Sequence, residues 1–63
     1  MESTILNDIA TLQNVVQGIN EDEKRSVILE FARKYSISEY KAEQIARNEI
    51  PVKDMVAALS KYS

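Results

Sequence analysis

A single glycine and a single proline, Gly18 and Pro51, interrupt this chain of 63 residues. A sheet of short strands needs frequent turns, and Gly, Pro and Asn-Gly pairs supply most of them. Because these residues are so scarce here, the sequence favours helices joined by few connections. The length allows one domain, over 1–63, which buries only about 60% of the surface that the unfolded chain exposes. We therefore expect an all-α fold, a miniprotein bundle of three to four short helices.

Apolar residues at helical spacing predict the first helix, over 4–17. Ser3 or Thr4 is the expected N-cap, and Gly18 is the expected end, as a residue that tolerates the left-handed conformation. The stripe steps by four, three and four residues, which places its members on one helix face. Its members are Ile5, Ile9, Leu12 and Val16.

A capping signal predicts the second helix, over 21–35. Asn20 can accept hydrogen bonds from the amides of the first turn, and Glu23, three residues later, can reach back to Asn20. Acidic residues at the start and Arg33-Lys34 near the end match the polarity of the helix dipole. The apolar stripe of this helix consists of Val27, Ile28, Phe31, Ala32 and Tyr35.

Two further helices are expected, over 38–48 and 51–61. Ser36 and Ser38 both qualify as the N-cap of the first of these, and Ser36 also begins an S-x-x-E box with Glu39. Pro51 suits the first helical position of the last helix. The inward residues of the two helices are Ala42, Ile45 and Ala46, followed by Val52, Met55, Val56 and Leu59.

The short turn between the second and third helices carries a resemblance, over about residues 28–48. The segment resembles the helix-turn-helix of small bacterial, phage and archaeal DNA-binding regulators and antitoxins. In that family a small residue lets the helices approach, a turn residue follows four positions later, and apolar residues close the core. The matching positions are Ala32, Ser36, Ile37, Ala42 and Ile45. The family usually has Gly where this chain has Ser36, and a left-handed Ser costs about 1–2 kcal/mol.

The resemblance implies a DNA-binding role in transcription regulation, with the third helix as the reader of the major groove. Amide side chains pair with adenine and Arg with guanine. The candidate base-reading residues are Tyr40, Lys41, Gln44, Arg47 and Asn48, and the candidate phosphate contacts are Lys24, Arg25, Arg33, Lys34 and Lys53. The two acids on the same helix, Glu39 and Glu43, would face the phosphates of the DNA. The alternative to DNA reading is that all these residues are ordinary solvated side chains on a helix that packs in the core.

The net charge of −2 and the pI near 5.0 average two unlike parts of the chain. Residues 1–23 carry five acidic and no basic residues, a balance of −5, and residues 24–63 carry eight basic and five acidic residues, a balance of +3. Such asymmetry indicates an electrostatic face. The overall negative charge therefore does not exclude a DNA partner.

The stripe of the first helix admits two interpretations. It either packs on the other helices of its own chain or forms a seam with a second chain, since pairing would enlarge a marginal core. The candidate dimer or partner interface consists of Ile5, Ile9, Leu12, Val16 and Ile19. We expect a homodimer. The alternative function is an acidic helical adaptor that binds another protein through the first helix or an apolar groove.

Catalysis and metal binding lack their usual residues in this sequence. The chain contains no His and no Cys, so Ser-His, Cys-His and common zinc sites are excluded, and one Gly makes no phosphate-binding loop. No apolar run approaches the ~20 residues of a membrane span. The first residues, Met1 to Thr4, lack the positive charge of a secretory signal. We expect a cytoplasmic, non-enzymatic protein with no cofactor, no metal and no membrane partner.

Overall fold

The computed structural model describes residues 2–61, and within them the chain forms helices and no strand. The helices are α1 (Glu2–Gln17), α2 (Glu21–Tyr35), α3 (Glu39–Ala46) and α4 (Val52–Ser60). This architecture confirms the all-α bundle. The predicted range of the second helix is also correct, whereas the third and fourth helices are shorter than the predicted 38–48 and 51–61.

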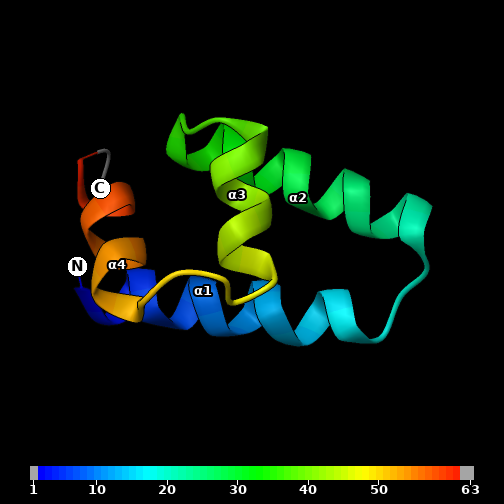
Figure 1. Cartoon of the computed structure of the whole chain (residues 1–63), viewed down its shortest axis with the longest axis horizontal. Coiled ribbons are helices and arrows are strands. Elements are labelled where there is room, and N and C mark those ends of the chain that lie inside the picture. Colours follow the sequence, from blue (N-terminus) through cyan, green and yellow to red (C-terminus); the bar gives the residue numbers. More distant parts are fainter. Residues whose placement is uncertain (1, 62–63) are drawn as a thin grey trace.

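The longest helix, α1, supports the other three. It contacts α2, α3 and α4, and α2 also contacts α3. In Figure 1, α1 and α2 run in opposite directions along the long axis, α3 crosses between them, and α4 lies over the beginning of α1. The connection between α2 and α3, residues 36–38, therefore turns the chain sharply, whereas α1 and α2 are antiparallel along the long axis.

One apolar cluster holds these helices together, with side chains from all four. The predicted α1 stripe is buried in it, and Ala42, Ile45, Met55 and Leu59 are fully enclosed. Val27, Ile37, Ile50 and Val56 pack on its margin, half-buried. The expectation that Val52 also faces inward is wrong: its side chain is 51% exposed, because it stands at the first turn of α4, where the chain enters from solvent.

The expected caps of α1 differ from the observed ones. The helix already begins at Glu2, so Ser3 and Thr4 lie inside it rather than at its N-cap. Gly18 follows the last residue of the helix as predicted, but no glycine here has a positive φ. Instead the Gly18 amide donates to the Val15 carbonyl at 3.1 Å, a tightened last turn that needs no left-handed residue.

The start of α2 confirms the capping box. The Asn20 side chain accepts from the Glu23 amide at 2.9 Å, and the Glu23 carboxylate accepts from the Asn20 amide at 3.4 Å. Two of the amides that a helix start leaves without partners are thereby satisfied.

The turn from α2 to α3 depends on Ser36, which has φ 55 and ψ 42 in the left-handed region. The Ile37 amide donates to the Ala32 carbonyl at 3.0 Å, and the Ser36 amide to the Arg33 carbonyl at 3.3 Å. This pair of bonds is the Schellman motif that ends many helices. Ser36 thus takes the conformation that usually selects glycine, as the helix-turn-helix resemblance implied for this position.

Because Ser36 ends α2, the N-cap of α3 is Ser38. Its hydroxyl accepts from the Lys41 amide at 3.0 Å. The predicted box between Ser36 and Glu39 is wrong, since Ser36 belongs to the preceding helix end. At the other end of α3, Asn48 has φ 58 and closes a second turn of the Schellman type. Pro51 is the N-cap of α4 rather than its first helical residue.

We predict that Ser36→Gly stabilises the fold by about 1 kcal/mol. The left-handed conformation costs an L-residue about 1–2 kcal/mol, and glycine gives back part of the gain through its larger unfolded-state entropy. For a chain of this size the melting temperature should rise by about 4–8 °C.

The matched control is Ser26→Gly, the same exchange at an exposed position inside α2, which should destabilise by about 0.5–1 kcal/mol. Thermal unfolding followed by circular dichroism measures both variants. Equal losses in the two variants would contradict a left-handed turn at Ser36.

Candidate nucleic-acid interface

The outward side of α3 gathers three of the five candidate base-reading residues. Ala42, Ile45 and Ala46 are buried, and helical spacing places Tyr40, Gln44 and Arg47 on the opposite side of the helix. Tyr40 and Arg47 are exposed there, whereas Gln44 is half-buried and its Oε1 is buried. This outward stripe is defined here by Tyr40, Gln44 and Arg47. The Tyr40 side chain is 72% exposed, and its hydroxyl accepts from the Gln44 amide nitrogen at 3.3 Å. Arg47 lies one residue beyond the last residue of α3.

The other two candidate readers lie beside this stripe. Lys41 is half-buried in the first turn of α3, and Asn48 is exposed in the turn that follows the helix. Asn48 also has a structural reason to be Asn, because this residue type tolerates the left-handed conformation that its turn requires.

Both acids of α3 are paired with arginines. Glu43 pairs with Arg47 on the next turn of the same helix, Oε2 to Nε at 3.0 Å, and Glu39 pairs with Arg25 of α2 at 3.9 Å. All four side chains are at least 43% exposed, so solvent screens both pairs and each contributes at most about 1 kcal/mol. The spacing of four residues would have predicted the first pair. The second pair joins residues from different helices, and no local pattern indicates it.

The candidate phosphate contacts do not form one surface. Lys24 pairs with Glu21 at 3.2 Å, and Lys34 pairs with Asp8 at 2.8 Å. Arg33 and Lys53 are exposed on α2 and α4. In the part of the chain that the structure describes, neither makes an ion pair. The basic residues are therefore distributed over several sides of the bundle.

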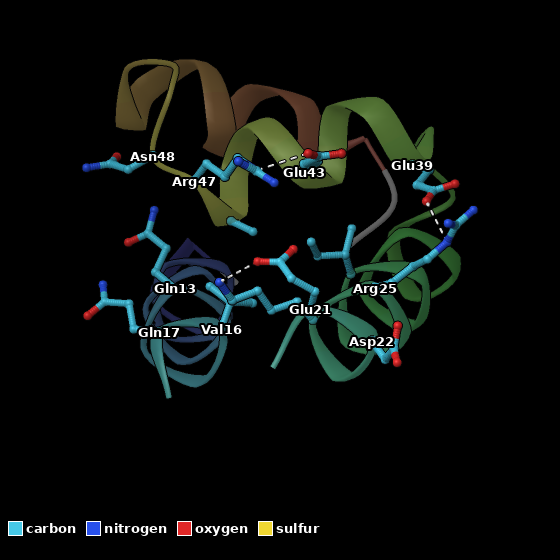
Figure 2. A pocket seen from close by; sticks show the side chains of 13 residues that line it. Gln13, Val16, Gln17, Glu21, Asp22, Arg25, Glu39, Glu43, Arg47 and Asn48 are labelled. Carbon is cyan, nitrogen blue, oxygen red and sulfur yellow. Dashed lines mark hydrogen bonds and ion pairs between the residues drawn. The ribbon is translucent and has the colours of Figure 1, made fainter. Parts of the chain in front are cut away.

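A cleft of about 680 Å³ lies between α1, α2 and the flank of α3 (Figure 2). Its acidic residues are Glu21, Asp22, Glu39 and Glu43, and its basic residues are Lys24, Arg25 and Arg47. Four acids against three bases leave a balance of −1. The cleft as a whole therefore repels a phosphate backbone, and Arg47 belongs both to the cleft and to the outward stripe.

A polar cluster joins α1 to the end of α2. The Tyr35 hydroxyl and the Lys34 ammonium both donate to Asp8 Oδ2, at 2.5 and 2.8 Å. These hydrogen bonds, Lys34 first and Tyr35 second, lower the pKa of Asp8 below its usual value. Burial of the Tyr35 ring, together with its bond to the Asp8 carboxylate, raises the pKa of Tyr35 to about 12.

Two of the three tyrosines of the sequence lie in different environments. Tyr35 is only 4% exposed and its hydroxyl is bonded to Asp8, whereas Tyr40 is largely exposed. The difference follows from helix phase: Tyr35 continues the buried stripe of α2, and Tyr40 lies opposite the buried residues of α3. Tyr62 lies outside the described residues.

The candidate interface on α1 is occupied by the chain itself. Ile5, Ile9, Leu12 and Val16 are at most 7% exposed, in contact with the rest of the core, and Ile19 is half-buried. The stripe therefore packs on the other helices of its own chain, which is the first of the two interpretations. A second chain that docks on the folded protein would therefore meet other residues.

Comparison of the chain with models of known families, with curated proteins and with solved structures finds no match. Among the described residues, no group of three or more Asp and Glu side chains is arranged to hold a metal ion. None of the helices in residues 2–61 has the length and apolar character needed to cross a bilayer.

We predict that the Asp8–Tyr35 bond makes stability fall at both ends of the pH scale. Asp8 has a lowered pKa in the folded chain, so its contribution is complete above the usual value of 3.8 and is lost as the pH falls through the folded pKa. Tyr35 has a raised pKa, so its contribution is complete below 10.0 and is lost between 10.0 and about 12.

Urea unfolding of the wild type and of Tyr35→Phe at pH 9 and at pH 11.5 measures the alkaline part. The difference in free energy of unfolding between the two proteins should shrink at the higher pH. A difference that stays constant would show that the Tyr35 hydroxyl does not titrate in the range that its contact with Asp8 implies.

Proposed function

We propose that this chain is a small DNA-binding protein of the helix-turn-helix type, a transcriptional regulator or an antitoxin-like protein, with α3 as its reader. The observation that carries the proposal is the left-handed turn at Ser36. This turn sets α3 across α2 and leaves Tyr40 and Arg47 exposed. Family comparisons contribute nothing to it.

The dimensions of α3 support the proposal. A helix with its side chains is about 10–12 Å across and fits the ~12 Å width of the major groove, and the eight residues of α3 would lie along about 12 Å of it. The outward stripe offers a phenol, an amide and a guanidinium. The guanidinium is the group that can make a bidentate contact with guanine, because the amide of Gln44 has its oxygen buried and its nitrogen bonded to Tyr40.

The paired acids of α3 are compatible with this role. Exposed ion pairs contribute little to stability, so Arg25 can exchange Glu39 for a phosphate contact at small cost. Arg47 can contact DNA through its terminal nitrogens while its Nε stays on Glu43. The two carboxylates still repel the DNA backbone. We therefore expect moderate affinity with a strong dependence on salt.

A fluorescence anisotropy titration with labelled duplex DNA at 50 and 200 mM salt tests the proposal. The affinity should fall about threefold for each phosphate contact over this range, because bound counterions are released. Absence of binding at both salt concentrations would contradict the DNA-binding function and favour the alternative, a non-enzymatic adaptor that binds another protein.

The double variant Lys41→Ala/Arg47→Ala should weaken binding by about tenfold or more. The matched control is Lys61→Ala, which removes a positive charge beyond the end of α4 and should change the affinity much less. If the double variant binds DNA as tightly as the wild type, α3 is not the reader.

A homodimer remains part of the proposal, since two readers placed one DNA turn apart bind half-sites better than one. The buried α1 stripe cannot be its seam in the folded chain. Sedimentation at tens of micromolar should give twice the chain mass of 7.2 kDa. The mass of one chain would remove the dimer and leave the reader assignment untouched.

A further inference from the structure

The Arg47 guanidinium is held by Glu43 through its Nε atom. The contact with Glu43 joins Nε to the carboxylate Oε2 at 3.0 Å, and the two side chains come from successive turns (Figure 2). Arg47 is 55% exposed and Glu43 is 43% exposed, so the pair lies at the surface rather than in the core.

A contact through Nε leaves the far end of the guanidinium open. The group has five N–H donors in a planar fork, and four of them are on the two terminal nitrogens. These terminal nitrogens match the O6 and N7 acceptors of guanine in the major groove. A guanidinium whose rotamers are already restricted by a neighbouring carboxylate loses less entropy when it makes that contact.

Arg47 lies where the outward stripe meets the cleft, which it lines together with Glu43. Arg47 follows Tyr40 by seven residues, a distance of about 10 Å along a helix. This distance corresponds to about three base steps of ~3.4 Å. Arg47 can therefore reach a base pair at one end of a short site while Tyr40 and Gln44 lie over its neighbours.

We propose that Arg47 reads a guanine through its two terminal nitrogens and that Glu43 is the positioning residue that orients it. This inference rests on the proposed DNA-binding function. It also gives a reason for a carboxylate on a surface that binds a polyanion: Glu43 weakens binding to every sequence but makes the binding selective for guanine.

The test begins with selection of the full chain on a duplex library with a random centre. On the selected site, each guanine is replaced in turn by the other bases and by 7-deazaguanine, which lacks the N7 acceptor. One guanine should be preferred about 5- to 150-fold over the other bases, the discrimination expected of a bidentate pair. The deaza base should lose a large part of that preference.

Three variants then separate the roles of the two residues. Arg47→Lys keeps the charge and the salt dependence but should lose most of the preference, because an ammonium has no planar fork. Glu43→Ala should bind random-sequence duplex more tightly, since one repulsive charge is gone, and yet lose most of the guanine preference. Arg33→Ala, the matched control, removes an exposed candidate phosphate contact on α2 and should lose affinity for all sequences alike while keeping the preference.

The outcomes are distinguishable. Failure of the library and of random duplex to bind at any salt would overturn both the inference and the proposed function. Binding without a guanine whose preference depends on Arg47 would overturn the inference alone. A Glu43→Ala variant that binds more tightly and keeps the full preference would show that Glu43 only repels DNA and does not orient Arg47.

Discussion

The left-handed backbone at Ser36 determines where α3 lies, and most of the remaining structure depends on it. The amides of Ser36 and Ile37 bond to carbonyls of the last turn of α2, which ends that helix and points the chain away from it. Ser38 can then cap α3, and Ala42 and Ile45 reach the core beside Ala32. A serine holds this conformation at a cost of about 1–2 kcal/mol, which the contacts of the neighbouring helices offset.

α1 compensates for the small size of the chain. Its apolar stripe forms one side of the core, and polar side chains beside that stripe connect α1 to α2 and α3. Gln13 donates to the Ile45 carbonyl at the end of α3 at 3.0 Å, and Asp8 accepts from Tyr35 and Lys34 of α2. Because α1 is used in this way, the short length of the chain no longer requires a second copy to complete a core.

Local patterns predicted much of this fold from the sequence. The all-α class followed from the scarcity of Gly and Pro and from the apolar stripes. The range of α2 followed from the capping box of Asn20 and Glu23 and from the apolar stripe behind it. The sequence could not decide between Ser36 and Ser38 as the N-cap of α3, nor fix the first residue of α1. In both places neighbouring polar residues satisfy the same capping rules. At the candidate site, the sequence indicated five exposed residues on the third helix, of which Lys41 and Gln44 are half-buried. The spacing of four residues would have predicted the pair of Glu43 and Arg47. The pairs Arg25–Glu39 and Lys34–Asp8 depend on how the helices cross, which no local pattern encodes.

The net charge of −2 is compatible with the outward stripe, on which Arg47 pairs with the carboxylate of Glu43. Our central proposal is that α3 is the surface that meets DNA. An NMR titration of the labelled chain with duplex DNA maps that surface residue by residue. The account predicts that amide shifts concentrate at Tyr40, Gln44 and Arg47 and along the turn before α3. Shifts confined to the outer face of α1, or none at a DNA excess, would contradict it.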